Sequence, residues 1–228
     1  MEAALNRLFY DEAEGFVGLN MLIKMARALG IPARVVRTWY KNQAINQIYK
    51  HRRRGKVKYH PTIGDGRSYQ ADIIFLPFPE ENDGYVGLMT FINTSTRKAY
   101  AYPIYGRRTE YLMNAIRQWM AEMNYLGHSV NSITTDNEFL RNKEITRYFA
   151  SLSIRHFVEM AGDHSKLGII NRFHRTLREL IMKVLEYHSS HHWLYFLERI
   201  MENYNSRINR TTGKAPEEMT MEDIVRLN

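Results

Sequence analysis

The sequence predicts an α/β protein in which a mixed five-stranded sheet flanked by helices follows a small helical domain. Three observations support this prediction. Residues 1–50 show helical spacing, residues 68–105 contain three successive β-rich runs, and residues 109–204 alternate helices with two more short strands. Strands that come first and then alternate with helices are typical of a mixed sheet with helices packed on it.

The composition excludes several classes of protein. The 228 residues, 44% of them apolar, suffice for one core and a small accessory domain. No apolar run reaches the ~18 to 20 residues of a membrane span, and an acid stands where a signal peptide would be basic. We therefore expect an intracellular protein with no membrane partner. The absence of cysteine leaves only oxygen or imidazole as metal ligands.

Positive charge is concentrated at the start of the chain. Residues 1–60 hold 12 Lys and Arg against 4 Asp and Glu, whereas residues 61–228 hold 20 of each. Because neutralising phosphates releases counterions, this asymmetry favours a polyanion-binding module joined to a charge-balanced body. A solvated basic face is the alternative.

Residues 1–50 are predicted to form a DNA-binding domain of the helix-turn-helix type. Two helical stretches, 22–29 and 33–40, are separated by Gly30, Ile31 and Pro32, which indicates a tight turn. Val35 and Trp39 are expected to be buried. The second helix would then present Arg34, Arg37 and Lys41 to a DNA groove. A helical bundle used only for subunit contacts is the alternative.

Residues 51–67 are interpreted as a basic linker. Its positive charges would track DNA phosphates or act as a nuclear address, and the sequence does not separate these two roles. The residues concerned are Arg52, Arg53, Arg54, Lys56 and Lys58.

Residues 68–228 are predicted to form a ribonuclease H-like core. The expected strands are 69–76, 85–93, 98–105, 132–136 and 153–159, and the expected helices are 109–126, 142–152, 165–187 and 193–204. In this fold the first and fourth strands lie side by side. Asp72, inside the first strand, and Asp136, at the end of the fourth, would meet at one edge of the sheet, and the long helix would bring position 171 across from them.

Carboxylates that converge at a sheet edge fit metal-dependent phosphodiester chemistry. Such chemistry needs an aligned nucleophile and a counter-charge for the phosphate oxygens, which one or two Mg²⁺ or Mn²⁺ ions supply through oxygen ligands. Asp72 would bridge the ions, Asp136 would hold one and Asn171 the other.

The long helix is predicted to have a buried stripe and an exposed ridge. Ile170, Phe173, Leu177, Leu180 and Val184 recur at helical spacing as the stripe. Asn171, Arg175 and Arg178 share another face, where the two arginines would grip phosphates near the reacting bond. Solvation of the helix is the alternative role for these arginines.

Four motifs, in this order, resemble the catalytic core of the DDE integrase superfamily, and most closely the integrases of Polinton/Maverick elements and large DNA viruses. They are Gln70-Ala71-Asp72, Thr135-Asp136-Asn137-Glu138-Phe139, residues 164–177 beginning His164-Ser165-Lys166 and including Asn171-Arg172-Phe173-His174, and the tail from Tyr204-Asn205 to Thr212-Gly213-Lys214-Ala215-Pro216. Similarity also extends into the leader at Gly15-Phe16-Val17-Gly18 and Trp39, so it covers nearly the whole chain.

This resemblance implies a mobile-element or viral integrase or transposase that trims element ends with water and then joins the exposed 3′-hydroxyl to target DNA. Its partners would be double-stranded DNA and further copies of the chain, as a dimer or tetramer. His164 and Lys166, just before the long helix, are expected to contact DNA.

The sequence departs from the family pattern in three places. Asn171 stands where the family has Glu, so a second ion should bind more weakly, and Glu138, Glu159 or Asp163 would have to compensate. An engineered inactive variant, a natural Asp-Asp-Asn enzyme and a decayed DNA-binding remnant each account for this. The cysteine-containing zinc domain of retroviral integrases cannot form, and the carboxy-terminal DNA-binding domain that integrases often carry is missing.

Two other functions remain open from the sequence. One is a catalytically silent DNA-binding protein derived from an integrase, which would use the front helices and the basic linker. The other is a ribonuclease H-type nuclease that cuts RNA–DNA hybrids, with the same fold and metals. The integrase-like tail and the DNA-binding front domain argue against the nuclease.

Overall fold

The computed structural model describes residues 1–48, 64–137, 139, 142–158 and 167–227. The chain forms two compact units. The first, called here the helical unit, comprises residues 1–60 and 177–203, and the second, the sheet unit, comprises residues 61–176 and 204–228. The sequence pattern did not suggest that residues 177–203 group with the amino-terminal helices.

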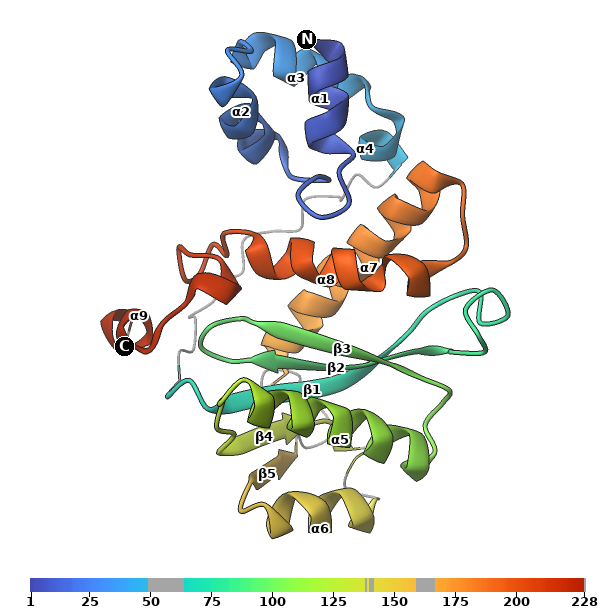
Figure 1. The fold of residues 1–228 in the computed structure, drawn as a ribbon, viewed down its shortest axis with the longest axis vertical. Helices are drawn as coiled ribbons and strands as arrows, with labels where there is room; N and C mark the ends of the chain where they lie inside the picture. The colour runs from blue at the N-terminus through green and yellow to red at the C-terminus, as the bar shows by residue number, and fades with distance from the viewer. Residues whose placement is uncertain (49–63, 138, 140–141, 159–166, 228) are drawn as a thin grey trace. The chain divides into compact units, whose positions relative to one another are not determined.

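The helical unit is built from the amino-terminal helices and from parts of two later ones (Figure 1). The elements are α1 Glu2–Phe9, α2 Leu19–Ala28, α3 Ala33–Asn42, α4 Ala44–Ile48, the second part of α7 Gly168–His188, and most of α8 Trp193–Ser206. Phe9 is fully buried and meets the rings of Trp39 and Tyr40 edge-on, with centroids 5.5 and 5.4 Å away. Tyr10 stacks on Tyr187 of α7 at 4.4 Å.

The predicted turn between α2 and α3 is present and is a Schellman motif. Gly30 has φ +71°, its N–H bonds to the carbonyl of Arg27, and the N–H of Ile31 bonds to the carbonyl of Ala26. In α3 the buried valine is one position later than predicted. Val36 is fully buried, whereas Val35 is half-buried, because Val36 and Trp39 are the pair that share the inner face.

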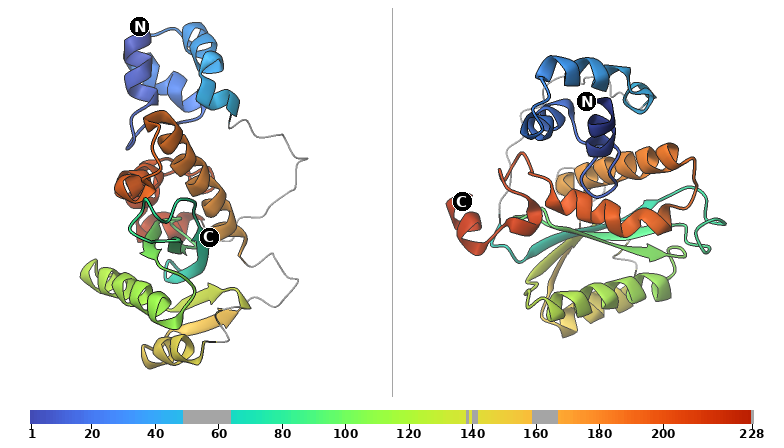
Figure 2. Two further views of the ribbon diagram at one scale, coloured as in Figure 1. Left: turned by 90° about the vertical axis from the view of Figure 1, so that its right-hand side faces the viewer. Right: turned by 45° about the horizontal axis from the view of Figure 1, so that its top comes forward.

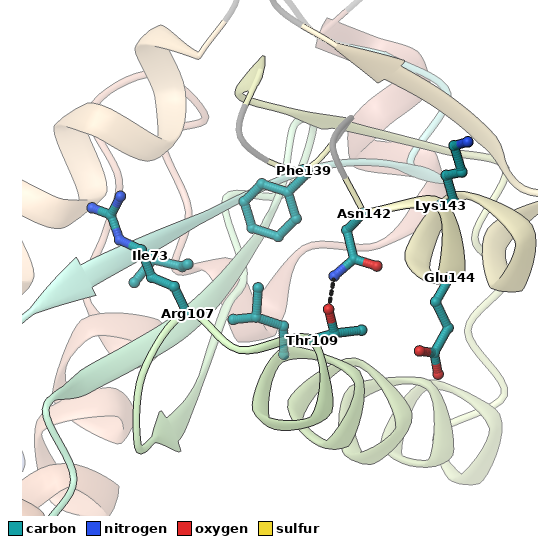
Figure 3. Close-up of a pocket in the computed structure, with 8 residues that line it drawn as sticks. Ile73, Arg107, Thr109, Phe139, Asn142, Lys143 and Glu144 are labelled. Carbon is teal, nitrogen blue, oxygen red and sulfur yellow. Dashed lines mark hydrogen bonds between the residues drawn. The ribbon is translucent and has the colours of Figure 1, made fainter.

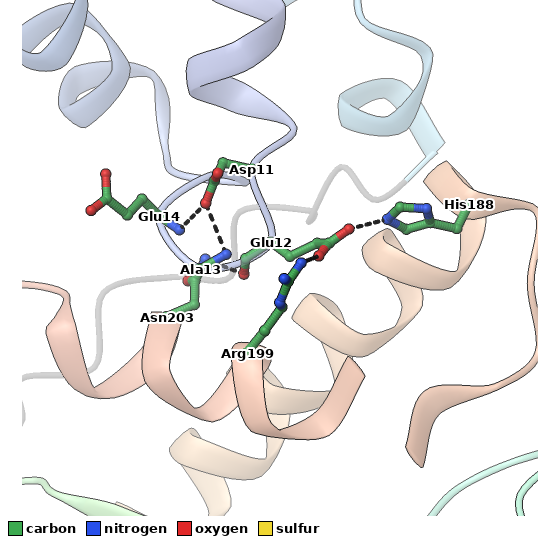
Figure 4. A network of polar contacts seen from close by, with 7 residues as sticks. All are labelled: Asp11, Glu12, Ala13, Glu14, His188, Arg199 and Asn203. Atoms are coloured by element: carbon green, nitrogen blue, oxygen red, sulfur yellow. Dashed lines mark hydrogen bonds and ion pairs between the residues drawn. The ribbon is translucent and has the colours of Figure 1, made fainter. Parts of the chain in front are cut away.

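A polar network fixes the loop after α1 to α7 and α8 (Figure 4). The carboxylate of Glu12, largely shielded from solvent, accepts contacts from His188 and Arg199. Asn203, almost fully buried, donates its side-chain N–H to the carbonyls of Glu12 and Gly15. His188, the last residue of α7, is thus part of this network.

The sheet unit contains a five-stranded sheet of order β3-β2-β1-β4-β5, as expected for a ribonuclease H-like core. The strands are β1 Ser68–Phe75, β2 Gly87–Asn93, β3 Ala99–Ile104, β4 Ser132–Thr135 and β5 Arg155–Val158. The first three pair antiparallel and β1, β4 and β5 pair parallel, so the sheet is mixed. Each strand end lies within two residues of its predicted position.

Two helices, α5 Thr109–Tyr125 and α6 Lys143–Ser151, lie on one side of the sheet (Figure 2). Buried residues of α5 and α6 form one apolar core with alternate residues of the strands, Tyr69 and Ala71 of β1 among them. Trp119 of α5 stacks on Phe91 of β2 with centroids 4.1 Å apart and planes at 8°, and both rings are fully buried.

The carboxy-terminal segment returns to the sheet at its β3 edge. Asn205 pairs with the main chain of Ala99 through both of its side-chain atoms, accepting from the N–H at 3.0 Å and donating to the carbonyl at 2.9 Å. A 3₁₀ turn, η2 Pro216–Glu218, and the short helix α9 Met221–Leu227 follow. Within the described residues, no helix combines the length and apolar content needed to cross a membrane.

We predict that Phe91→Ala will lower the free energy of unfolding by about 3–5 kcal/mol, because it leaves a cavity under Trp119 in a close-packed core. Urea denaturation followed by circular dichroism measures this. Tyr125→Ala is the control, since Tyr125 is 89% exposed at the end of α5 and its loss should change stability by no more than about 0.5 kcal/mol. Equal effects of the two substitutions would contradict this account of the core.

Candidate functional site

The register of the sheet brings Asp72 and Asp136 to the same level. Strands β1 and β4 pair in parallel from Ser68 opposite Ser132 to Gln70 opposite Thr134. Asp72 lies two residues after Gln70, and Asp136 lies two residues after Thr134. Since neighbouring strands are about 4.8 Å apart, the two aspartates occupy adjacent positions at the carboxyl ends of the paired segments.

The face of β1 that carries Asp72 is the face covered by the start of α7. Successive strand residues point to opposite faces, so Gln70 and Asp72 share a face, and Ala71 points into the α5 core on the other. The side-chain oxygen of Gln70 accepts a 2.9 Å hydrogen bond from the N–H of Ile170 in α7. This bond joins residues 100 positions apart and fixes the first turn of α7 against β1.

Asp72 is held by groups from three elements. Its Oδ1 lies 2.7 Å from the N–H of Ile73, and its main-chain carbonyl accepts a 2.9 Å bond from the hydroxyl of Thr90, its partner across the β1–β2 pair. The same hydroxyl lies 2.6 Å from Nε2 of His174, whose Nδ1 lies 3.6 Å from Oδ2 of Asp72. Thr90 is fully buried and His174 is 8% exposed, while the Asp72 side chain retains 21% exposure.

Asp136 follows β4 directly and is half-buried. Its carbonyl accepts from the hydroxyl of Thr135 and from the N–H of Phe139, a turn that leads toward α6. The hydroxyl of Thr135 also lies 2.8 Å from Nε2 of His156 on β5. Burial lowers the pKa of the His156 imidazole below its ordinary value and so favours the neutral ring.

Asn171 is exposed on α7, between the two residues of that helix that contact β1 and β2. The predicted buried stripe is confirmed, since Ile170, Phe173, Leu177, Leu180 and Val184 are all buried. His174 belongs to that buried side, four residues after Ile170, and was missed as a site residue. Its position on the stripe is the signal that could have identified it.

The donor set at this edge fits a hard divalent cation held by few protein ligands. Two carboxylates at one level, with water and phosphate oxygens completing the shell, are a usual arrangement for Mg²⁺. Among the residues that the structure describes, no three His, Asp or Glu side chains gather closely enough to hold a metal by themselves. Glu138, Glu159 and Asp163 lie outside the described residues.

A pocket of about 680 Å³ lies beside β1 and the first turns of α5 and α6 (Figure 3). Its apolar wall includes Ile73, which follows Asp72, and Phe139, three residues after Asp136. Arg107 and Lys143 contribute positive charge, and Asn142 donates to the hydroxyl of Thr109 across the pocket at 2.7 Å. The remaining lining residues are Leu112 and Glu144.

The predicted DNA-contacting residues fall in separate places. Arg34, Arg37 and Lys41 are exposed on one side of α3, opposite its buried residues. Arg175 and Arg178 are exposed on α7, the first in the sheet unit and the second in the helical unit. The structure does not describe the others, namely Arg52, Arg53, Arg54, Lys56, Lys58, His164 and Lys166.

The fold matches solved structures of retroviral integrases. A trimeric integrase catalytic core of HTLV-2 in complex with magnesium aligns with TM-score 0.53 and 16% identity over 67% of this chain and 95% of that one. The dimeric form aligns with TM-score 0.52 and 17% identity over 68% and 95%. A simian T-cell lymphotropic virus intasome in complex with the PP2A regulatory subunit B56 gamma aligns with TM-score 0.58 and 15% identity over 89% and 70%.

At these identities the likeness establishes the fold, a ribonuclease H-like core of the integrase type. No protein-family model matches the chain, and no curated protein matches it.

We predict that Thr90→Val will lower the free energy of unfolding by about 1–3 kcal/mol. The substitution keeps the side-chain shape but leaves the Asp72 carbonyl and His174 Nε2 without this buried partner. Thr90→Ser is the matched control, because it keeps the hydroxyl and loses one methyl, about 0.8 kcal/mol. If the valine variant is as stable as the wild type in urea denaturation, the hydroxyl bonds contribute nothing to stability.

Proposed function

We propose that this protein is a DNA integrase or transposase of a mobile element or virus, related to Polinton-type integrases, in which Asp72 and Asp136 hold the catalytic cation. The observation that carries the proposal is the parallel register of β1 and β4, which brings both carboxylates to one level at the edge of the sheet. The likeness in fold to integrase catalytic cores supports it.

The reaction we propose has two steps, trimming of the element ends and joining of these ends to target DNA, and both follow the same chemistry. Water, and later a 3′-hydroxyl, attacks a phosphorus atom, and the bond from phosphorus to the 3′-oxygen on the opposite side breaks. A bound Mg²⁺ or Mn²⁺ supplies charge to the phosphate oxygens and lowers the pKa of the nucleophile. Asp72 and Asp136 would hold it, with the carbonyl oxygen of Asn171 as a further ligand, and the exposed Arg175 would grip a neighbouring phosphate.

DNA would be held by charge at two further places. The pocket lined by Ile73 and Phe139, with the cations Arg107 and Lys143, would accept a DNA strand. The exposed cations of α3 would serve as a recognition surface for double-stranded DNA. Joining two element ends to a target requires at least two copies of the chain, so we propose a homo-oligomer that acts in the nucleus or the virion.

We predict that the protein will join duplex oligonucleotides with randomised termini to supercoiled plasmid DNA only when Mn²⁺ or Mg²⁺ is present. Asp72→Asn and Asp136→Asn should each reduce joining by at least about 100-fold, because losing a ligand costs more than losing an outer-shell partner. Asn171→Glu should raise activity in Mg²⁺, since it adds a negative charge at an exposed helix position. Sequencing the joined products measures both rate and end preference.

Asp83→Asn is the control for these substitutions, because Asp83 is exposed and its φ of +54° is one that asparagine tolerates. If the wild type and Asn171→Glu both fail to join any terminus, while DNA binding persists and is indifferent to Asp72→Asn, the protein is a silent DNA-binding relative. Cleavage restricted to RNA–DNA hybrids would instead favour the ribonuclease.

We predict that replacing Arg34, Arg37 and Lys41 together with glutamine will weaken duplex DNA binding and flatten its salt dependence. Each lost phosphate contact should reduce the slope of log K against log salt by about 0.9. Fluorescence anisotropy at several salt concentrations measures the slope. The control removes three exposed cations of the sheet unit, Arg147, Arg155 and Arg226, and equal flattening by both variants would contradict a specific role for α3.

A further inference from the structure

The start of α7 has no capping side chain of its own. The N–H of Asn171 donates to the carbonyl of Leu167, so Leu167 is the residue at which the helical hydrogen bonds begin. Helices usually begin at Ser, Thr, Asp or Asn, because the side-chain oxygen of these residues accepts a hydrogen bond from an N–H of the first turn. The side chain of Leu167 is apolar and buried, and it has no acceptor for these groups.

Gln70 supplies this acceptor from β1. Ile170 is the third residue after Leu167, and its N–H is one of the two that a capping side chain usually accepts. It donates to the side-chain oxygen of Gln70 at 2.9 Å. Gln70 is only 6% exposed, so water has little access to take its place. A strand residue 100 positions earlier in the chain thus caps the long helix.

This cap joins the two elements that carry candidate ligands. Gln70 lies on the same face of β1 as Asp72, two residues before it, and Ile170 directly precedes Asn171. The contact between His174 and Thr90 lies about one turn further along α7. Position 171 therefore directly follows a residue whose main chain is bonded to β1.

We propose that Gln70 is a positioning residue for position 171, because by capping α7 it holds the first turn of the helix against the strand that carries Asp72. The inference rests on the proposed function, in which Asn171 is a ligand of the cation that Asp72 holds. Gln70 acts through the main chain of α7 and needs no contact of its own with the ion or with DNA.

Two substitutions of Gln70 test the cap itself. Gln70→Met keeps a side chain of similar length and removes the acceptor, whereas Gln70→Glu keeps an acceptor in either protonation state. The contact between Thr90 and His174 remains in both, so α7 should stay docked from residue 174 onward. Hydrogen exchange at the amide of Ile170, followed by nuclear magnetic resonance, should be about 2- to 30-fold faster in Gln70→Met and close to wild type in Gln70→Glu.

A double-mutant cycle separates positioning of residue 171 from stability of the helix alone. Asn171→Glu adds a charged oxygen ligand, so in the otherwise native chain it should strengthen Mn²⁺ binding about 10-fold. In the Gln70→Met background this gain should be at least about threefold smaller, because the first turn is no longer held. A role in helix stability alone predicts the same gain in both backgrounds.

The affinities are measured by titrating the full chain with Mn²⁺ alone and following free Mn²⁺ by electron paramagnetic resonance. Binding that is lost in Asp72→Asn defines the site. Asn205→Leu is the matched control, because it also removes hydrogen bonds from an amide side chain to the main chain, those to Ala99. It should leave the gain from Asn171→Glu unchanged, with circular dichroism confirming that each variant is folded.

An equal gain from Asn171→Glu in the Gln70→Met and native backgrounds, or unchanged exchange at Ile170, would overturn the positioning role and leave the proposed function standing. Should Gln70→Met be unfolded, Gln70→Asn, which withdraws the acceptor by one methylene, takes its place in the cycle.

Two results would instead count against the proposed site. If the wild type binds no Mn²⁺ that depends on Asp72, the metal site is wrong. If such binding exists but Asn171→Glu strengthens it in neither background, position 171 holds no ligand. The role of Gln70 falls in either case.

Discussion

The docking of the first turns of α7 on β1 and β2 is the constraint on which the candidate site depends. Two hydrogen bonds secure it, one donated by the N–H of Ile170 to the side chain of Gln70 and one between Thr90 and His174. Both are buried, so breaking either would leave polar groups without water or protein partners. Together they fix the rotation of the helix and determine that Asn171 points to solvent.

This docking also explains how a charged residue is tolerated inside an apolar strand. The two faces of β1 have different surroundings, since Tyr69 and Ala71 pack in the α5 core while Gln70 and Asp72 face α7. On the second face, Gln70 bonds to the main chain of Ile170, and the main-chain carbonyl of Asp72 accepts from Thr90. Because successive side chains of a strand point to opposite faces, β1 contributes apolar residues to the core and polar residues to the candidate site.

The fold was predictable because its signals are local. Strand and helix periodicity, the glycine after α2 and the order of elements are each read over a few residues, and from them the adjacency of β1 and β4 follows. The alignment of Asp72 with Asp136 could be predicted from that adjacency and from the position of each residue along its strand.

What the sequence did not predict depends on contacts between distant segments. The role of Thr90 requires the register that sets it opposite Asp72, and that of His174 requires the exact rotation of α7, neither of which composition specifies. The grouping of residues 177–203 with the amino-terminal helices likewise depends on long-range contacts such as Glu12 with Arg199. Such pairings are set by tertiary packing, which periodicity does not encode.

The side-chain pairing of Asn205 with Ala99 has a consequence for self-association. An outer strand with open main-chain groups invites another chain to add to the sheet, which is a route to aggregation. At Ala99 both groups already have a partner within the same molecule, and the amide of Asn205 imitates a neighbouring strand there. Addition of a strand from another copy of the chain is therefore disfavoured at this point of β3.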